Sequence, residues 1–336
     1  MSGLKHTLVI RPGALGDSVL TLPALHALRL AGAENLLVLG TTASWGFARQ
    51  DHNGLRIRDF ASSEWLGLFS EGAPFGECAR AALSRIQSAV VYLSGDTSSA
   101  ERALKAHGVQ RVLTIPPPQA VARDVTAPHA SRQLTGALSP WISAETIERA
   151  HALALALQDA QHDCFIQLDE VEKHRALYGI GLDAVPSSGF VAIHPGSGGV
   201  KKCWPPQRFA RLAVELACHD GVVPLVFFGP ADAATREAFE AAMPPGVEWQ
   251  PVDSRPLREV LALLSLSRGY IGNDSGLSHL AARVCPTLAI FGPSNRDVWC
   301  PVGSRVRIVQ APDGQLERLS VDAVQDAWAE LAALNA

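Results

Sequence analysis

KHTLVIRPGALGDSVLTLPALHALR, residues 5–29, joins a short apolar run to a helical pattern through a break of proline and glycine. The apolar run, LVI at 8–10, predicts a buried strand. Between residues 19 and 28 the apolar side chains recur at helical spacing, which predicts a helix with one buried face. The stretch therefore predicts a strand, a tight turn and a helix, the opening of an α/β sheet.

The same pattern returns at GFVAIHPGSGG, residues 189–199, where Pro195 and Gly196 align with Pro12 and Gly13. Strand-like and helix-like segments alternate in both halves of the chain, which predicts parallel sheets with helices on both faces. The other strand-like runs are NLLVLGT (35–41), AVVYLSG (89–95), RVLTI (111–115), VVPLVFFG (222–229), GYIGN (269–273) and TLAIFG (287–292). We expect two Rossmann-like domains related by an internal repeat.

The domain boundary is expected where VPSSG, beginning at residue 185, has the composition of a linker. This predicts an N-terminal domain over residues 1–184 and a C-terminal domain over residues 185–336. The last helix has two possible positions, within the C-terminal domain or packed back on the N-terminal one. In sheets of this kind ligands bind outside the carboxyl ends of the strands, so a cleft between those ends is the expected site.

Size and composition exclude several classes of protein. The chain has 336 residues, of which 47% are hydrophobic and 18% charged, so we expect a globular protein and not a disordered one. The net charge of −4 argues against a nucleic-acid binder. No apolar run reaches the roughly 18 residues that a membrane span needs, and the N-terminus lacks a signal-peptide pattern. We therefore expect a cytoplasmic protein whose six scattered cysteines are reduced.

RPGALGD, residues 11–17, does not match the standard nucleotide-binding loops. A dinucleotide fingerprint needs G-x-G-x-x-G, but Leu15 stands where its second glycine belongs; a Walker loop needs a lysine that is absent here. The turn instead places Asp17 at the start of a helix. By spacing alone a helix cap is the preferred role of Asp17, and a catalytic carboxylate is the alternative.

Two further segments have features of an anion site. In IGNDSGLSHLAA, residues 271–282, a strand ends at Asn273 and a helix follows, so the acid and serine that come next either cap the helix or lie beside a bound anion. His279 faces such a ligand or is a core residue. In HPGSGGVKKCWP, residues 194–205, accessible backbone amides and two lysines could meet a diphosphate, although a solvated loop is the alternative.

A D-x-D triplet, the pattern by which many nucleotide-sugar enzymes hold a divalent metal on the diphosphate, does not occur in the sequence. Lysine side chains and helix N-termini would then balance the phosphate charge. We therefore predict a metal-independent site with no cofactor.

Taken together, these segments resemble glycosyltransferase family 9, the bacterial heptosyltransferase family of lipopolysaccharide inner-core synthesis. Three blocks carry the resemblance: RPGALGDSVLTLPALHALR, HPGSGGVKKCWPPQRFARLA and GYIGNDSGLSHLAARVCPTLAIFGPSN; HASRQLTGAL at 129–138 is a fainter fourth. The resemblance implies a GT-B fold, with two Rossmann-like domains and parallel sheets facing across a cleft. The N-terminal domain would bind the sugar acceptor and the C-terminal domain the nucleotide-sugar donor, typically ADP-heptose.

The resemblance also implies roles for individual residues. Asp17 would be the general base, and Lys202, or Lys201 beside it, would contact the donor phosphates. The remaining residues expected at the donor diphosphate are Ser197, Asp274, Ser275, Gly276, Leu277 and His279. The residues expected on the acceptor side are Gly13, Gly16, Arg49, Arg56, Arg58, Arg123 and Arg132. Asp232 and Glu237 are candidates for the ribose.

The expected reaction is an inverting transfer of heptose from ADP-heptose to a lipopolysaccharide inner-core acceptor, in a monomer that contacts the inner face of the cytoplasmic membrane peripherally. Alternatives within the family are another sugar nucleotide, or a protein or surface-glycan acceptor. Alternatives of another class are a non-catalytic sugar-nucleotide-binding protein and an NAD-dependent oxidoreductase, although the glycine spacing disfavours the oxidoreductase.

Overall fold

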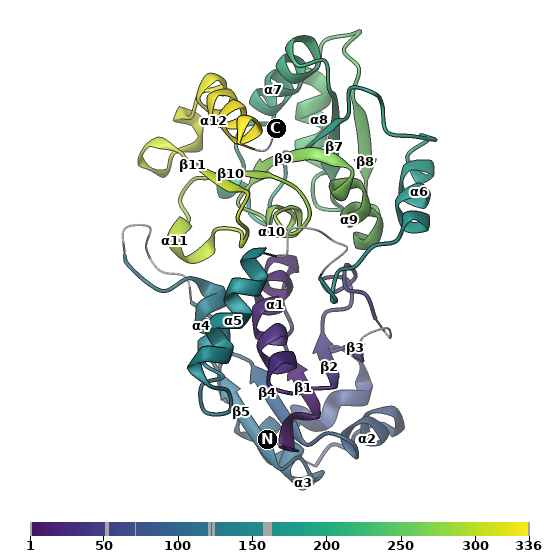
Figure 1. The fold of residues 1–336 in the computed structure, drawn as a ribbon, viewed down its shortest axis with the longest axis vertical. Coiled ribbons are helices and arrows are strands. Elements are labelled where there is room, and N and C mark those ends of the chain that lie inside the picture. The colour runs from purple at the N-terminus through teal and green to yellow at the C-terminus, as the bar shows by residue number, and fades with distance from the viewer. Residues whose placement is uncertain are drawn as a thin grey trace. The chain divides into compact units, whose positions relative to one another are not determined.

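The computed structural model describes residues 2–50, 54–70, 72–119, 122, 125–156 and 163–334 (Figure 1). The chain divides into two compact units. The first comprises Met1–Gln119 and Ala130–Ala154, and the second comprises Ala120–His129 and Leu155–Ala336. Each unit contains one parallel sheet, as the alternation of strand-like and helix-like segments predicts.

The sheet of the first unit has the strand order β3-β2-β1-β4-β5, and all its pairs are parallel. Its strands are β1 (His6–Ile10), β2 (Asn35–Gly40), β3 (Leu55–Asp59), β4 (Ser88–Tyr92) and β5 (Arg111–Ile115). The order reverses between β1 and β4. RPGALGD therefore leaves the sheet at the point where open α/β sheets bind their ligands.

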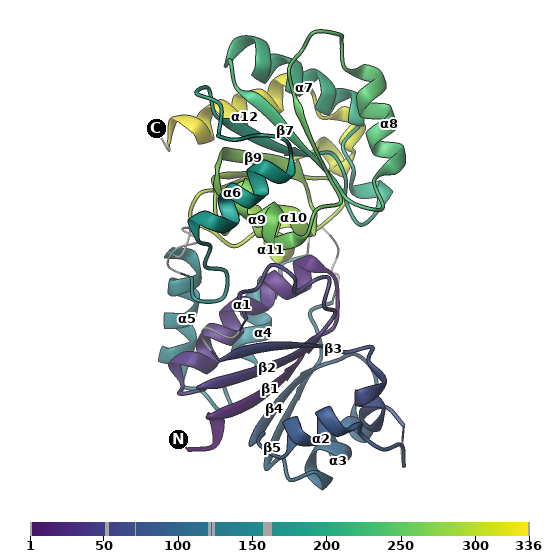
Figure 2. The same ribbon diagram turned by 90° about the vertical axis from the view of Figure 1, so that its right-hand side faces the viewer.

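Helices cover both faces of this sheet. Figure 2 shows α1 and α4 on one face and α2 and α3 on the other. The bounds are α1 (Leu15–Leu30), α2 (Glu77–Leu83), α3 (Ser98–Ala106), α4 (Ala130–Gly136) and α5 (Ala144–Ala156), with 3₁₀ turns η1 (Ser2–Leu4) and η2 (Ser63–Leu68). Buried side chains of β1, β2 and β4 pack with η2, α2 and α3 in one apolar core.

The sheet of the second unit has the strand order β11-β10-β9-β6-β7-β8, and is also parallel throughout. Its strands are β6 (Phe190–His194), β7 (Val223–Phe228), β8 (Gln250–Asp253), β9 (Ser267–Asn273), β10 (Thr287–Phe291) and β11 (Val306–Gln310). Here the order reverses between β6 and β9. The two glycine-containing motifs of the second half follow these two strands.

Helices again cover both faces: α7, α8 and α12 pack on one, and α9 and α10 on the other (Figure 2). The bounds are α6 (Glu170–Gly179), α7 (Pro206–His219), α8 (Ala233–Ala242), α9 (Leu257–Ser265), α10 (Gly276–Ala281), α11 (Arg296–Trp299) and α12 (Val321–Ala333). The 3₁₀ turns are η3 (Val200–Lys202), η4 (Pro312–Gly314) and η5 (Leu316–Arg318). Buried residues of α12 join the core formed by α7 and the sheet, so α12 packs within the second unit.

The segment before β6 also packs on the second unit, so the compact units divide the chain earlier than the linker composition at residue 185 suggests. Helix α6 packs against α9, and Glu172 pairs with Arg258 at 2.6 Å. Asp163 lies fully buried and pairs with Arg283 at 3.1 Å. The linker-like segment VPSSG therefore lies just before the first strand of the second sheet, but its composition gives no information on where α6 packs.

Among the residues that the structure describes, no helix is both long and apolar enough to span a membrane. All six cysteines lie in the described part of the chain and are free thiols. Burial raises the pKa of the Cys285 thiol to about 12. This thiol is therefore neutral near pH 7 and behaves as a core residue.

The pair between Asp163 and Arg283 generates a stability prediction. Asp163→Asn leaves the buried Arg283 charge without its carboxylate, which costs about 3 kcal/mol. We expect a loss of that size in the protection of β6 and β9 amides, measured by native-state hydrogen exchange. Asp322→Asn, which removes an exposed pair with Arg211, is the control and should cost less than about 1 kcal/mol. Equal protection in the two variants would contradict the prediction.

Candidate functional site

Polar residues gather at the carboxyl ends of β6 and β9, the two adjacent central strands where the order of the second sheet reverses. HPGSGG begins at His194, the last residue of β6, and NDSG begins at Asn273, the last residue of β9. The crevice outside such a reversal point is where open parallel sheets bind ligands, since the connections leave in opposite directions there. The structure therefore brings together two motifs that lie almost 80 residues apart in the sequence.

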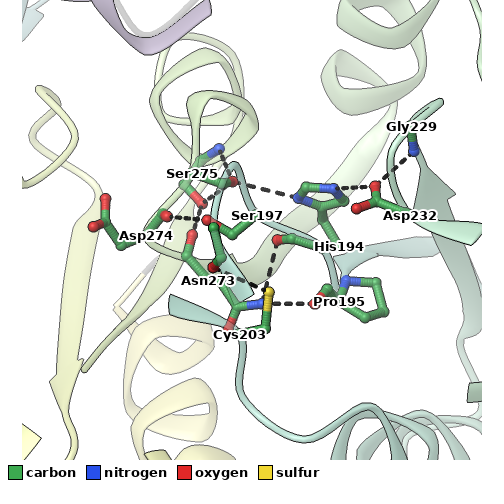
Figure 3. Close-up of polar contacts among 12 residues, drawn as sticks. His194, Pro195, Ser197, Cys203, Gly229, Asp232, Asn273, Asp274 and Ser275 are labelled. Atoms are coloured by element: carbon green, nitrogen blue, oxygen red, sulfur yellow. Dashed lines mark hydrogen bonds and ion pairs between the residues drawn. The ribbon is translucent and has the colours of Figure 1, made fainter. Parts of the chain in front are cut away.

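Asn273 joins the two motifs (Figure 3). Its side chain is fully buried, and Nδ2 donates to the carbonyl oxygens of Pro195 at 2.7 Å and Gly196 at 3.2 Å. Its Oδ1 accepts from the backbone N–H of Trp204 at 2.9 Å. One amide group thus fixes both ends of the glycine-rich loop against the end of β9.

The loop residues expected at the diphosphate contact the acid of the second motif. Ser197 Oγ donates to the backbone carbonyl of Asp274 at 2.8 Å. Lys202 Nζ lies 2.8 Å from Asp274 Oδ2, and the lysine side chain is 43% exposed whereas that of Asp274 is 6% exposed. The buried carboxylate of Asp274 therefore holds the ammonium group of Lys202 at the surface of the site. Lys201 beside it is exposed on η3.

The Trp-Pro pair that ends the loop is an anchor. Trp204 is fully buried; its ring packs edge-to-face on Phe209 with centroids 4.9 Å apart. Its Nε1 donates to the carbonyl of Leu319 at 3.0 Å. The loop is thus held at its two ends, while Val200 in its middle is 90% exposed.

The second motif begins helix α10 with Ser275 as its N-cap. Ser275 Oγ accepts from the N–H of Ser278 at 3.5 Å, so the serine, and not Asp274, makes the cap contact. Gly276 is partly exposed, whereas Leu277 and His279 are buried, with 9% and 5% exposure. His279 is therefore buried, and its contact with a diphosphate stays a prediction.

His194 and Asp232 form a buried pair beside this cap. His194 Nε2 lies 3.3 Å from Asp232 Oδ2, and Nδ1 lies 3.3 Å from Ser275 Oγ. Asp232 Oδ2 also accepts from the N–H of Gly229 at 2.7 Å. Burial raises the pKa of Asp232, but the His194 hydrogen bond and charge and the Gly229 N–H outweigh it, so the pKa lies below its ordinary value.

Gly196 packs directly against this pair. A Cβ at position 196 would lie 2.2 Å from Asp232 Oδ1, so only glycine fits. Asp232, a candidate for the ribose, is 7% exposed and belongs to the network. Glu237, the other candidate, is exposed on α8 and lies outside it. Their contact with a ribose stays a prediction.

In the first unit, both oxygens of Asp17 have hydrogen-bond partners. Oδ1 accepts from Arg11 Nη2 at 2.8 Å, and Oδ2 accepts from the backbone N–H of Ala14 at 3.0 Å. Ala14 is the N-cap of α1, so Asp17 is its third helical residue and makes the contact of a capping-box acid. Asp17 therefore does have the expected capping contact, and its side chain is still 36% exposed.

Arg11, the partner of Asp17, is itself held in place by its surroundings. Arg11 is 4% exposed, and its Nε donates to Thr21 Oγ1 at 3.2 Å. Burial lowers the pKa of the Arg11 guanidinium, an effect that Asp17 opposes; an arginine nevertheless stays charged. Gly13 has φ +142°, and a Cβ there would lie 2.6 Å from Asp17 Oδ2. The turn before α1 thus requires glycine for the approach of the carboxylate.

Comparison with known proteins assigns the chain to a family. The model of glycosyltransferase family 9 (heptosyltransferase) matches residues 99–328, more than half of the chain. The chain belongs to glycosyltransferase family 9. Lipopolysaccharide heptosyltransferase 2 of Escherichia coli is 30% identical over 156 residues, and lipooligosaccharide heptosyltransferase 2 of Haemophilus influenzae is 27% identical over 184. These matches cover 44% and 53% of this chain, and 43% and 46% of the relatives, so the similarity spans about half of each protein.

Solved structures of this family share the fold over nearly the whole chain. The E. coli ADP-heptose LPS heptosyltransferase II matches with TM-score 0.72 and 18% identity over 98% of this chain and 99% of its own. A family 9 glycosyltransferase of Veillonella parvula matches with TM-score 0.75 and 17% identity over 99% of each chain. With the two parallel sheets, these matches confirm the predicted GT-B fold class.

The described arginines among those expected on the acceptor side belong to three segments of the first unit. Arg56 and Arg58 lie on the exposed face of the edge strand β3. Arg132 on α4 pairs with Glu148 at 3.0 Å. Arg49 is partly exposed in the loop after β2, Gly16 is partly exposed in α1, and Arg123 lies outside the described residues. That these residues contact a sugar acceptor stays a prediction.

His194, Asn273 and Arg11 are members of these networks that the sequence analysis did not single out. All three are polar residues at the end of, or directly after, a buried strand in a parallel sheet. Such a position is itself a signal, because a buried polar side chain needs hydrogen-bond partners and finds them in the loops at the strand ends.

The contacts of Asn273 generate a prediction about the loop. Asn273→Ala leaves the buried Trp204 N–H and the Pro195 carbonyl without partners, at about 1–3 kcal/mol for each group. We expect faster hydrogen exchange at the Trp204 amide and at residues 196–199. Glu237→Ala, on the exposed face of α8, should leave these amides unchanged. Unchanged exchange in Asn273→Ala would mean that the loop is held by other contacts.

Proposed function

We propose that this chain is an inverting, metal-independent glycosyltransferase that transfers heptose from ADP-heptose to a lipopolysaccharide inner-core acceptor. The observation that carries the proposal is the Asn273 junction, which holds a glycine-rich loop and the NDSG motif side by side at the reversal point of the second sheet. Family membership and the similarity to proteins named lipopolysaccharide heptosyltransferase 2 support the choice of sugar and acceptor.

The donor diphosphate would bind at this junction. Lys202 supplies positive charge at the surface, and Lys201 is exposed beside it on η3. Ser197, Ser275 and Gly276 supply hydroxyl and backbone groups of the kind that bind phosphate oxygens. Since the two lysines and nearby backbone N–H groups can offset the diphosphate charge, we propose that the reaction needs no divalent metal. The same lysines, hydroxyls and backbone N–H groups would stabilise the negative charge that develops on ADP as it leaves.

Asp17 would act as the general base. Its oxygens each accept one hydrogen bond, and a carboxylate has about four acceptor positions, so positions remain for a sugar hydroxyl. In the proposed reaction Asp17 takes the proton of the acceptor hydroxyl while that oxygen forms a bond to the anomeric carbon. The bond from this carbon to the ADP oxygen breaks on the opposite face, and its electron pair leaves with ADP.

The proposed substrates indicate where in the cell the protein would act. ADP-heptose is a cytoplasmic metabolite in this proposal, and the acceptor is anchored in lipid. We therefore propose a cytoplasmic protein with peripheral contact at the inner face of the cytoplasmic membrane. The exposed arginines of β3, Arg56 and Arg58, are candidates for anionic groups of such an acceptor.

Substitution of Asp17 tests the base. Asp17→Asn keeps the shape and the hydrogen-bond acceptor toward Arg11 but cannot take up the proton, so we expect kcat for heptose transfer to fall by about 10²–10⁴-fold. The Kd for ADP, measured by calorimetry, should stay within about twofold, because the residues proposed to contact the donor belong to the second unit. A near-normal kcat would mean that Asp17 is only a capping residue.

A glycine pair serves as a matched control for the position of the carboxylate. Gly13→Ala introduces a Cβ 2.6 Å from Asp17 Oδ2 and should lower kcat with unchanged ADP affinity. Gly32→Ala imposes a left-handed backbone on alanine in the same unit, at φ +100°, but meets no atom within 4 Å. It should leave kcat near that of the unchanged protein.

Nucleotide selectivity and metal dependence are tested together. We expect ADP to raise the melting temperature in thermal-shift measurements, because it binds only the native state, and UDP, GDP and NAD to have little effect. The shift with ADP, and the transfer of heptose from ADP-heptose, should persist in excess EDTA. Selective stabilisation by NAD would indicate an oxidoreductase, another nucleotide would indicate another donor, and loss of transfer in EDTA would contradict metal independence. ADP binding without any transfer would indicate a non-catalytic binding protein.

A further inference from the structure

A buried chain of hydrogen bonds runs from Asp232 through His194 to the Ser275 hydroxyl, and the proposed reaction gives His194 no role (Figure 3). All three residues are less than 9% exposed. Ser275 is also the cap of α10 and a predicted contact of the diphosphate. The imidazole therefore touches a residue of the donor site from the interior of the protein.

The partners of the imidazole decide which nitrogen can change its protonation. The pKa of Asp232 lies below its ordinary value, so its carboxylate is charged near pH 7 and accepts a hydrogen bond from Nε2–H. The Nε2 proton is thereby retained in the neutral and in the charged ring. Nδ1 is then the nitrogen that gains or loses a proton.

The state of Nδ1 decides whether the Ser275 hydroxyl can donate to the imidazole. Ser278 Oγ, also 3.3 Å from Ser275 Oγ, is its other possible acceptor in this network. When Nδ1 carries no proton, it accepts the hydrogen bond from Ser275, and the hydroxyl proton points inward. When Nδ1 is protonated, it donates to Ser275 Oγ, and the hydroxyl proton can turn to another acceptor. A phosphate oxygen at the α10 cap is such an acceptor, and a hydrogen bond to it is charge-assisted.

From this geometry we infer that His194 is a positioning residue that takes up a proton from solvent when the donor diphosphate binds, and so turns the Ser275 hydroxyl toward a phosphate oxygen. The inference rests on the proposed function, because it needs a diphosphate at the α10 cap. It adds proton uptake to donor binding and links the pH of the medium to ADP affinity.

Other titratable groups border this network of hydrogen bonds. Burial and the Asp232 charge raise the pKa of the Cys203 thiol. Burial raises the pKa of Tyr270, whose hydroxyl contacts Ser278 beside Ser275. Both groups are therefore neutral at pH 7. Asp274, which precedes Ser275, forms its ion pair with Lys202.

Proton uptake is measured by titrating the full chain with ADP in a calorimeter, at pH 7.5, in two buffers of different ionisation enthalpy. The terminal phosphate of ADP also titrates near this pH, so the informative quantity is the difference between variants. We expect the unchanged protein to take up about one proton more per ADP than His194→Asn. His219→Gln, at an exposed histidine of α7, should match the unchanged protein.

Ser275→Ala separates coupling from a structural role of the histidine. This variant keeps His194 and Asp232 but has no hydroxyl to turn, so the extra proton uptake should disappear and the ADP affinity should fall about tenfold. Equal proton uptake in the unchanged protein, His194→Asn and Ser275→Ala would overturn the inference while leaving the proposed function intact. If His194→Asn does not fold, Ser275→Ala alone decides between these outcomes. No ADP binding by the unchanged protein would overturn both.

Discussion

The buried amide of Asn273 is the contact on which the second unit's site depends. The carboxyl ends of neighbouring parallel strands bring loops together, but they do not by themselves fix the loops in one conformation. Asn273 does so because a single side chain can donate twice and accept once, and it is buried where water cannot compete. Ser197, Lys202 and Ser275 then take positions relative to this junction.

The sequence predicts the central strands of both sheets and does not predict three edge strands. Strands β1, β4, β6 and β10 are buried on both faces, so they consist of nearly continuous apolar runs. At the edges, β3, β8 and β11 are only partly buried. In LRIRD, the sequence of β3, arginines alternate with apolar residues, and such a short segment has no strong signal by itself.

The candidate sites could be predicted in part for the same reason. Motifs that follow central strands pointed to Ser197, Lys202 and the NDSG block, since glycines and polar residues interrupt a clear apolar pattern there. Asn273, His194 and Arg11 belong to the same networks, but their partners lie in other parts of the chain, so only the three-dimensional structure reveals their contacts. The residues expected on the acceptor side have no comparable pattern, and among the described arginines only Arg56 and Arg58 share an element, β3.

The glycine-rich loop has one position that admits only glycine and two positions that can carry a side chain. Gly196 cannot be replaced without displacing Asp232, whereas a Cβ at Gly198 or Gly199 would meet no atom within 4 Å. Both of these glycines also have room for side chains next to Lys201 and Lys202 of η3. Divergence within a family can therefore alter the surface of the proposed donor site at positions 198 and 199 while the buried junction stays constant. Directed evolution of donor preference can begin at the same two positions at little cost to folding.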